Sequence, residues 1–201
     1  MIAIIDYNAG NLFSVKNALD YIGEPCVVTN DAAELEKADA LILPGVGAFP
    51  AAMRQLGQTG LPDILRAQIQ KKPLLGICLG MQILFERSFE FEPYAGLGFI
   101  SGEIRRIPET GLKIPHMGWN ALRFLTPSPL LEGVPEGSYF YFVHSYMAFT
   151  ADANVSAYAE YGTRVTAMVW DGGNVFGSQC HPEKSGEPGL TVLRNFGRLS
   201  R

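Results

Sequence analysis

Residues 72–82, Lys-Pro-Leu-Leu-Gly-Ile-Cys-Leu-Gly-Met-Gln, place a short apolar run directly before a cysteine and a helix-like segment. Residues 74–77 are too few for a helix and follow a proline, which favours a strand buried on both faces of a parallel sheet. After Cys78 the period changes, and the next residues have the spacing of one helix face: Leu79, Gln82, Ile83 and Glu86. The stretch therefore predicts a strand that turns sharply into a helix at Cys78.

A cysteine on such a turn has the position that a nucleophile needs. Gly76 and Gly80 flank Cys78 without side chains, and the start of the following helix offers free backbone N–H groups that can bind an oxyanion. A lone cysteine after an apolar strand is, however, more often a small buried hydrophobe. The nucleophile hypothesis therefore requires a base elsewhere in the chain.

The composition is that of a single globular domain spanning residues 1–201. Of the 201 residues 47% are hydrophobic and 18% charged, which is enough to bury a full core. A net charge of -4 leaves no basic stripe and argues against nucleic acid as a partner. Three cysteines without metal-ligand spacing indicate a reduced, cytoplasmic protein, and no apolar run approaches the length of a membrane span. Asp6 breaks the first apolar run, so we expect a strand there and no signal peptide.

The first part of the chain alternates strand and helix patterns. We expect strands at residues 2–5, 26–29, 40–43 and 74–77, and helices at residues 12–22, 31–37 and 64–69. This rhythm predicts right-handed crossovers and a largely parallel sheet. Because such sheets bind ligands at the carboxyl ends of their strands, loops 6–11 and 44–47 should converge with the turn at Cys78.

Beyond about residue 90 strand patterns dominate. We expect strands at residues 99–107, 121–125, 139–143, 155–161, 165–170 and 174–180, a hairpin turn at 171–173, and a final helix at 190–198. These strands either extend the sheet in antiparallel fashion or form a small second layer. The predicted fold is a three-layer α/β structure with a mostly parallel central sheet, helices on both faces and added antiparallel strands.

His181 and Glu183 supply the partner that Cys78 requires. A cysteine nucleophile needs an imidazole to take its proton and return it to the leaving amine, and the imidazole needs a carboxylate to orient it. His181 and Glu183 are two residues apart at the end of an expected strand, where Pro182 stiffens the turn. His116 and His144 compete as bases, although neither has a carboxylate two positions away.

The loop Pro44-Gly45-Val46-Gly47 is the candidate for a second half of an oxyanion hole. Two spaced glycines most often make a plain turn. At the end of a parallel strand beside Cys78, however, peptide N–H groups at Val46 and Gly47 could hold a tetrahedral oxyanion together with the N–H of Leu79. Glycine at position 47 also allows the Val46–Gly47 peptide to reorient.

These motifs together resemble those of the triad-type (class I) glutamine amidotransferases. The resemblance rests on residues 44–47, 76–82 and 181–183 in this order and spacing. Within that family, four further stretches resemble the glutaminase subunits of imidazole glycerol phosphate synthases: residues 6–11, 81–82, 115–120 and 181–185. The similarity covers essentially all 201 residues.

The resemblance implies roles for individual residues. Cys78 would be the nucleophile, His181 the general base and then acid, and Glu183 the group that orients His181. The residues implied at the bound glutamine are Gly45, Gln82, Glu90, Ser145 and Tyr146. The residues implied at a partner interface, through which ammonia passes, are Asn11, Trp119, Tyr141 and Lys184.

The implied reaction is hydrolysis of L-glutamine to glutamate and ammonia through a γ-glutamyl thioester. The ammonia would pass, within a heterodimer, to a (βα)₈-barrel cyclase subunit of imidazole glycerol phosphate synthase. That subunit forms imidazole glycerol phosphate and AICAR from PRFAR in histidine biosynthesis. No metal or organic cofactor is implied, since the thiol supplies the chemistry.

The sequence departs from the family pattern at two places, and three other functions remain as alternatives. Cys180 precedes His181, where the family usually carries an aromatic residue, and residues 89–94 around Glu90 are bulkier than the usual glycine-rich version. The rivals are a glutaminase subunit of another synthase (anthranilate or pyridoxal phosphate), a non-enzymatic α/β protein with an oxidisable cysteine, and a cysteine peptidase on the same scaffold.

Overall fold

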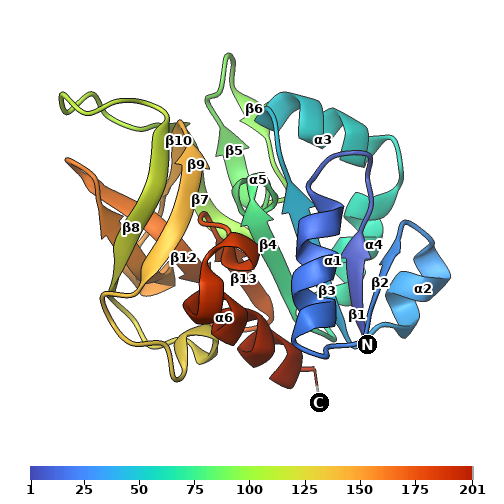
Figure 1. Cartoon of the computed structure of the whole chain (residues 1–201). Helices are drawn as coiled ribbons and strands as arrows, with labels where there is room; N and C mark the ends of the chain where they lie inside the picture. Colours follow the sequence, from blue (N-terminus) through green and yellow to red (C-terminus); the bar gives the residue numbers. More distant parts are fainter. Residues whose placement is uncertain (201) are drawn as a thin grey trace.

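The computed structural model describes residues 1–200, and its first half alternates strands with helices (Figure 1). The strands are β1 (Ile2–Ile5), β2 (Cys26–Thr29), β3 (Ala40–Gly45) and β4 (Leu74–Cys78). The helices are α1 (Leu12–Tyr21), α2 (Ala32–Lys37), α3 (Phe49–Gly57), α4 (Leu61–Gln68) and α5 (Leu79–Gln82). This order confirms the strands expected for this half and the positions of α1 and α2.

The second half consists mainly of strands and ends in a helix. Its strands are β5 (Phe85–Ser88), β6 (Tyr94–Ala95), β7 (Ile100–Arg106), β8 (His116–Phe124), β9 (Tyr139–His144), β10 (Tyr146–Phe149), β11 (Val155–Glu160), β12 (Arg164–Trp170) and β13 (Val175–Ser178). Short 3-10 helices are η1 (Pro129–Leu131), η2 (Asp152–Asn154) and η3 (Pro182–Lys184), and the chain closes with α6 (Gly186–Arg198). Within residues 1–200, no helix is both long enough and apolar enough to cross a bilayer.

The strands form two sheets. The main sheet has nine strands in the order β2-β1-β3-β4-β13-β12-β11-β8-β9, and the smaller sheet has four in the order β10-β7-β5-β6. In the main sheet the pairs from β2 to β13 are parallel, and those from β13 to β9 are antiparallel. The sequence left open whether the second-half strands extend the main sheet or form a second layer. In the structure some of them extend the main sheet and others form the second layer.

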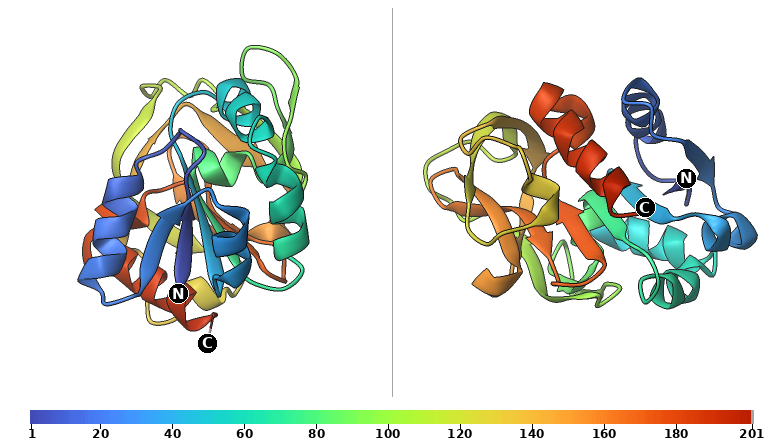
Figure 2. Two further views of the ribbon diagram at one scale, coloured as in Figure 1. Left: turned by 90° about the vertical axis from the view of Figure 1, so that its right-hand side faces the viewer. Right: turned by 90° about the horizontal axis from the view of Figure 1, so that it is seen from below.

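Two apolar cores lie on opposite faces of the main sheet. In β1, Ile2 and Ile4 belong to the core covered by α1 and α6, while Ala3 and Ile5 belong to the core covered by α2, α3, α4 and the smaller sheet. A strand buried on both faces is apolar at every position, which explains the unbroken apolar runs in the sequence. Figure 2 shows helices on both sides of the strands. The three-layer α/β fold is therefore confirmed.

The helix after Cys78 is shorter than its pattern predicts. It ends at Gln82, and Glu86 lies in β5, so the expected continuation of the helix was wrong. The reason is tertiary: the carbonyls of Ile83 and Leu84 accept hydrogen bonds from the backbone N–H groups of residues 97, 99 and 100. Those carbonyls are then not available to a continuing helix.

Several other elements differ from expectation. Helix α3 was not predicted, and α4 begins three residues before the expected helix, at Leu61, just after Gly60 with a φ of 72°. Strand β8 begins at His116 and not at residue 121, because residues 116–121 pair in register with β9. The short strands β5, β6 and β10 were also not predicted.

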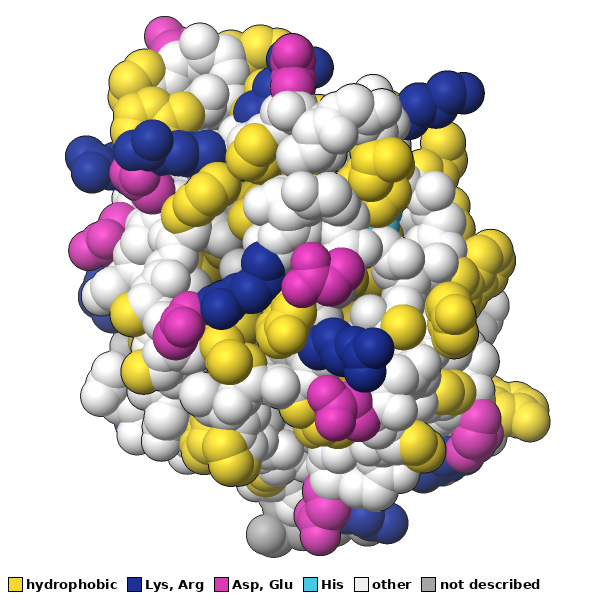
Figure 3. All heavy atoms as spheres, turned by 90° about the vertical axis from the view of Figure 1, so that its left-hand side faces the viewer, with side chains coloured by type: hydrophobic (Ala, Val, Ile, Leu, Met, Phe, Trp, Pro, Cys, Tyr) yellow, Lys and Arg dark blue, Asp and Glu magenta, His cyan; other side chains and the backbone are white. Residues whose placement is uncertain are grey.

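Charged side chains are mixed on the face that lies at the left in Figure 1. Figure 3 shows Lys and Arg side chains on this face lying among Asp and Glu side chains, with hydrophobic atoms between them. A mixture of this kind does not build a strong field of one sign on this face.

Candidate active site

Cys78 occupies a strained turn between β4 and α5. Its φ of 56° and ψ of -113° lie outside the regions that non-glycine residues normally adopt. The turn is possible because α5 lies directly on the backbone of the sheet: a Cβ on Gly80 would lie 1.7 Å from the carbonyl oxygen of Leu43, and one on Gly76 would lie 2.6 Å from that of Gly80. Glycine is therefore required on both sides of the cysteine.

Strand pairing brings His181 to Cys78. Strand β13 pairs in parallel with β4, and Ser178 lies opposite Ile77, so the residues that follow each strand meet at the same edge of the sheet. His181 Nδ1 lies 2.8 Å from Oε1 of Glu183, with only 3% of the histidine side chain and 1% of the glutamate side chain exposed. This is the pairing that the spacing of the two residues predicted.

The environment of His181 favours its protonated form. Burial works to lower the pKa of His181, but the neighbouring Cys78 thiol and then the Glu183 carboxylate outweigh it and raise the pKa to about 9. The other ring nitrogen, Nε2, is buried and has no hydrogen-bond partner within residues 1–200. This nitrogen is therefore free to exchange a proton with the thiol and a reacting substrate.

A cavity of about 250 Å³ opens over the thiol. It is lined by Val46, Gly47, Cys78, Leu79, Gln82, Val143, His144, His181 and Lys184. The cavity thus brings together the candidate nucleophile, the base and the three residues of the candidate oxyanion hole. Gly47 has a φ of 98°, a backbone conformation that glycine adopts readily and that residues with a side chain rarely adopt.

Gln82 lies in this cavity with its amide orientation determined. Its Nε2 donates one hydrogen bond to the Tyr146 carbonyl at 3.0 Å and another to Oε1 of Gln179 at 2.9 Å. Both amide hydrogens are therefore used within the protein. Its Oε1 has no hydrogen-bond partner within residues 1–200 and remains available to accept one from a substrate carboxamide.

The remaining residues expected at glutamine lie around the cavity and do not line it. Glu90 accepts a hydrogen bond from the backbone N–H of Phe49 at 2.7 Å, where α3 begins. Gly45 borders a narrower gap shared with His181 and Glu183. The Ser145 carbonyl accepts from Ile107, and the Tyr146 carbonyl accepts from Gln82.

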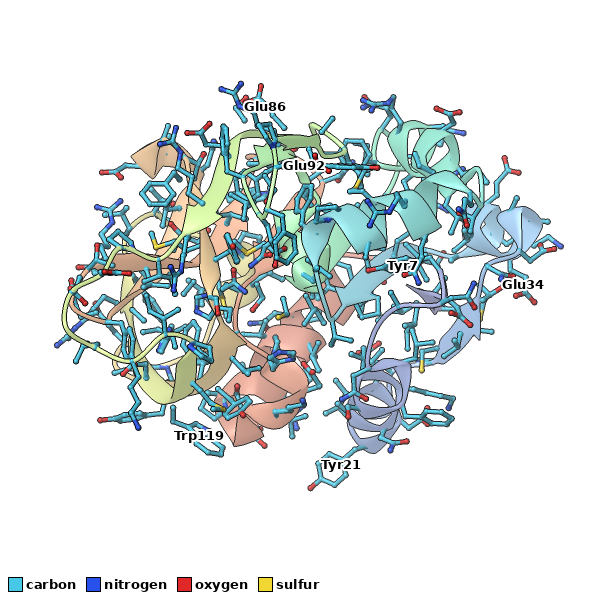
Figure 4. The ribbon with its side chains drawn as sticks, turned by 90° about the horizontal axis from the view of Figure 1, so that it is seen from above. Tyr7, Tyr21, Glu34, Glu86, Glu92 and Trp119 are labelled. Atoms are coloured by element: carbon cyan, nitrogen blue, oxygen red, sulfur yellow. The ribbon has the colours of Figure 1, made fainter. Side chains whose placement is uncertain are left out.

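Three of the four expected interface residues form one cluster beside His181. The rings of Trp119 and Tyr141 lie 4.9 Å apart, Lys184 Nζ lies 6.0 Å from the Tyr141 ring, and the rings of Tyr141 and His181 are 6.2 Å apart. Trp119 is 60% exposed and projects from the molecule in Figure 4. Asn11 lies apart from this cluster, where it caps α1 and borders the gap beside His181 and Glu183.

The two competing histidines bond to each other. Nδ1 of His116 lies 3.0 Å from Nε2 of His144, whose own Nδ1 lies 2.8 Å from the Tyr146 carbonyl. Burial lowers the pKa of His116 to about 4 and that of His144 to about 3. Both imidazoles are therefore neutral at pH 7, and within residues 1–200 neither has a carboxylate partner such as the one that His181 has.

Gln179 is the residue at this site that the sequence did not reveal. It is fully buried, and its Nε2 lies 3.8 Å from Sγ of Cys78. The contact joins residues that are 101 positions apart, so no local pattern marks it. The register of β4 and β13 is the signal that would have predicted it, because Gln179 and Cys78 directly follow the paired residues Ser178 and Ile77.

Cys180 lies outside this chemistry. Its thiol is buried, contacts the Ser178 hydroxyl at 3.1 Å, and has a pKa that burial raises to about 12. All three cysteines are unpaired, and no group of three or more His, Cys, Asp or Glu within residues 1–200 has the arrangement of a metal site.

Comparisons with known proteins find similar sequences over nearly the whole chain. Residues 3–198 match the family model for glutamine amidotransferase class-I. "Imidazole glycerol phosphate synthase subunit HisH" of Bacillus cereus (strain G9842) is 52% identical over 197 residues, covering 98% of this chain and 93% of the relative. The protein of the same name from Caldanaerobacter subterraneus subsp. tengcongensis is 49% identical and covers 99% of this chain and 98% of the relative.

Solved structures show the same fold at low sequence identity. One, described as a crystal structure of glutamine amidotransferase, has a TM-score of 0.77 and 20% identity, covering 100% of this chain and 99% of its own. Another, the structure of PurLQS from Thermotoga maritima, has a TM-score of 0.74 and 21% identity, covering 97% of this chain and 96% of its own.

Proposed function

The chain belongs to the class-I glutamine amidotransferase family, and from this premise we propose how its residues carry out the reaction. Relatives 49–52% identical over nearly the whole chain are subunits of imidazole glycerol phosphate synthase. The chain acts as the glutaminase subunit of such a synthase in histidine biosynthesis. We further propose that residues 1–201 form one glutaminase domain and that it works in the cytoplasm, for which the three unpaired cysteines provide support.

The observation that carries the mechanism is the meeting of Cys78, His181 and Glu183 at one edge of the sheet. Sγ of Cys78 attacks the γ-carboxamide carbon of glutamine, and His181 passes a proton to the leaving ammonia. A water molecule, deprotonated by His181, then attacks the carbonyl carbon of the resulting thioester. The C–S bond breaks, glutamate is released, and His181 returns the proton to Sγ of Cys78. Glu183 accepts from the Nδ1–H of His181 and so directs Nε2 toward the reacting atoms.

Backbone groups in the cavity stabilise the tetrahedral intermediate in this proposal. The N–H of Leu79, at the start of α5, and N–H groups at Val46 and Gly47 form the oxyanion hole. Gln82 accepts a hydrogen bond from the substrate carboxamide through its free Oε1. Gly45, Ser145, Tyr146 and Glu90 act at the α-amino and carboxylate end of glutamine. Glu90 accepts one hydrogen bond from Phe49 through Oε2, and its carboxylate keeps further acceptor sites for the α-amino group.

The chain is one subunit of a synthase complex, and we propose that the other is a (βα)₈-barrel cyclase. Support comes from the exposed aromatic cluster of Trp119 and Tyr141 next to Lys184, because exposed aromatic residues beside a cation are typical of protein interfaces. Met117, on the same side of β8, is 62% exposed. A barrel docked on this cluster and on Asn11 receives ammonia directly from the cavity.

The test is release of glutamate from glutamine by the purified chain, alone and with a cyclase subunit and its nucleotide substrate. We expect Cys78→Ala to abolish activity in both cases and Cys26→Ala, which changes a cysteine distant from the cavity, to retain it. Activity that depends on Cys78 but does not respond to the cyclase would overturn the partner assignment. Activity that survives Cys78→Ala would overturn the mechanism.

A further inference from the structure

The buried glutamine Gln179 contacts the sulfur atom on which the proposed reaction begins. Its Nε2 lies 3.8 Å from Sγ of Cys78, and the side chain is fully shielded from solvent. The parallel pairing of β4 with β13 places the two residues opposite each other at the ends of their strands. The contact therefore belongs to the sheet and does not depend on the loops around the cavity.

The orientation of the Gln179 amide follows from its neighbours. A backbone carbonyl can only accept hydrogen bonds, so the Gln82 atom that lies 3.0 Å from the Tyr146 carbonyl is the amide nitrogen. The second hydrogen of that nitrogen points to Gln179 across 2.9 Å, so the atom that receives it is the Gln179 oxygen. Gln179 must then turn its NH₂ group, a hydrogen-bond donor, toward Cys78.

The same network continues away from the thiol as far as β8. The Tyr146 carbonyl also accepts from Nδ1 of His144, so Nε2 of this neutral ring is an acceptor and the bond at 3.0 Å comes from Nδ1–H of His116. Nε2 of His116 then accepts from Asn120, which lies at 3.0 Å. Asn120 donates as well to the Glu160 carbonyl, so the proton positions are consistent from both ends of the network.

We propose that Gln179 is a further catalytic residue of the glutaminase, whose Nε2–H donates a hydrogen bond to Sγ of Cys78. The inference rests on the proposed function. No proton is transferred by the amide. It stabilises negative charge on sulfur twice, before the attack on glutamine and again when sulfur leaves the thioester. Gln82, His144, His116 and Asn120 are positioning residues, which act by keeping the Gln179 amide turned toward the sulfur.

The network reaches the exposed strand that carries the proposed interface. Asn120 adjoins Trp119, and alternate residues of β8 point to opposite faces of the sheet. Trp119 and Met117 therefore face outward, while the buried His116 and the half-buried Asn120 belong to the hydrogen-bonded network. A partner that shifts β8 would act on the thiol through this network.

The rate at which iodoacetamide alkylates Cys78 measures the reactivity of this thiol directly. The measurement does not require glutamine to be hydrolysed. In Gln179→Met the donor is lost, and in Gln179→Glu a carboxylate that cannot donate faces the sulfur. A hydrogen bond to a charged group is worth enough to change a rate by about ten- to a hundredfold. We expect the alkylation rate at pH 7 and kcat in the complex to fall by about this factor, with KM for glutamine changed less than about twofold.

Gln68→Glu is the matched control, because Gln68 is also a buried glutamine but lies in α4, outside the cavity. It should leave the alkylation rate of Cys78 unchanged. Equal alkylation rates in the unaltered protein and in Gln179→Met would overturn the proposal, and Gln179 would then serve only to fill the core. Failure of the unaltered protein to hydrolyse glutamine, with the alkylation difference intact, would instead overturn the proposed function.

A measurement on the unaltered protein covers the case in which neither Gln179 variant folds. In protein labelled with ¹⁵N-glutamine, the side-chain amide signal of Gln179 should shift when Cys78 is alkylated, whereas that of Gln68 should not. A Gln179 signal that does not respond would overturn the contact.

The positioning role is tested by combining variants. His116→Phe removes both hydrogen bonds of the ring but retains an aromatic surface against Phe142 and Tyr161, on which His116 stacks. It should slow alkylation of Cys78 severalfold in the unaltered background and have no effect when Gln179 is already methionine. Equal effects of His116→Phe in the two backgrounds would remove His116 from the network.

Discussion

Nδ1 of His181 lies 2.8 Å from Oε1 of Glu183, and the two side chains are almost completely shielded from solvent. The bond directs Nε2 of the ring toward the thiol, because it leaves the Nδ1 proton on the side of the carboxylate. A pair closed off in this way is screened little by salt, so its effect on the imidazole persists at physiological ionic strength.

Glu183→Gln is expected to lower kcat for glutamine by about 10²- to 10⁴-fold, because a neutral amide no longer fixes the tautomer of His181 or stabilises its charged form. The KM for glutamine should change little, since Glu183 does not line the cavity. The measurement is steady-state glutaminase kinetics in the complex. Glu187→Gln, an exposed carboxylate in α6 paired with Arg194, is the control and should retain activity. A similar loss in both variants would contradict this prediction.

Gly80→Ala is expected to prevent the turn at Cys78 from forming, because its Cβ would lie 1.7 Å from the Leu43 carbonyl oxygen. The expected result is loss of glutaminase activity with a lower melting temperature, measured by circular dichroism. Gly57→Ala is the matched control, since a Cβ at the end of α3 meets nothing within 4 Å. That variant should be as stable as the unaltered protein or slightly more so. An active Gly80→Ala protein would show that α5 does not rest on β3.

Lys72→Met is expected to destabilise the protein without affecting the cavity. Lys72 Nζ lies 3.1 Å from the Leu35 carbonyl oxygen and 2.7 Å from that of Glu36, and it also bonds the Ala38 carbonyl. In this variant the three carbonyl groups at the end of α2 lose the hydrogen bonds that Lys72 Nζ donates to them. We expect the free energy of unfolding to fall by roughly 2–4 kcal/mol. Urea unfolding checks the value, and Lys71→Met at the exposed neighbouring position should change it by less than about 0.5 kcal/mol.

The protein should lose stability as the pH falls below 6.5. The folded-state pKa values of His116 (about 4) and His144 (about 3) lie below the ordinary value of 6.5, so the unfolded chain binds protons more tightly. The stabilising contribution is complete above pH 6.5 and is lost progressively toward pH 4 and below. At about 1.4 kcal/mol per pKa unit, the loss between pH 6.5 and 4.5 amounts to several kcal/mol. Urea unfolding at a series of pH values should show a shallower dependence for His116→Gln, and an unchanged dependence would contradict the assignment.

The three thiols should react with iodoacetamide in a fixed order. Cys78, beside a protonated His181, should react first. Cys26 is partly exposed, but burial and then the Asp20 charge raise its pKa, so it should follow. Cys180 is fully buried with a pKa of about 12 and should react only in denaturant. Mass spectrometry of peptides after timed alkylation checks the order, and early labelling of Cys180 would contradict it.

The sequence predicted the parallel half of the fold well, because residues 2–5 and 74–77 carry the unbroken apolar runs of strands buried on both faces. It predicted the antiparallel half less well. Strand β8 begins at His116, and its first residues carry no apolar alternation, because their inward members are the histidine and asparagine of a polar network. The end of α5 at Gln82 could not be predicted from the local sequence for another reason. The carbonyls that follow it accept hydrogen bonds from backbone N–H groups within residues 97–100, which are distant in the sequence.

At the site, the local features could be predicted and the distant ones could not. The turn at Cys78 and the pair of His181 and Glu183 each depend on residues within four positions of one another. The contact of Gln179 with Cys78 depends on the neighbours of β4 in the sheet, and periodicity contains no information about strand order. The position of Glu90 at the start of α3 could not be predicted either, because α3 itself was missed.

The register that sets Ile77 against Ser178 has a consequence for how this enzyme can change. Cys78 is the last residue of β4, and His181 lies three residues after the end of the neighbouring strand β13. Their separation is therefore determined by the backbone hydrogen bonds of the sheet and not by the length of the surface segments around the cavity. Insertions or deletions in the segments that surround the cavity can therefore alter which molecules enter and which protein docks, while the distance between thiol and imidazole stays the same. The geometry of the reactive residues is therefore constant, while the sequence and length of the surrounding surface loops can vary.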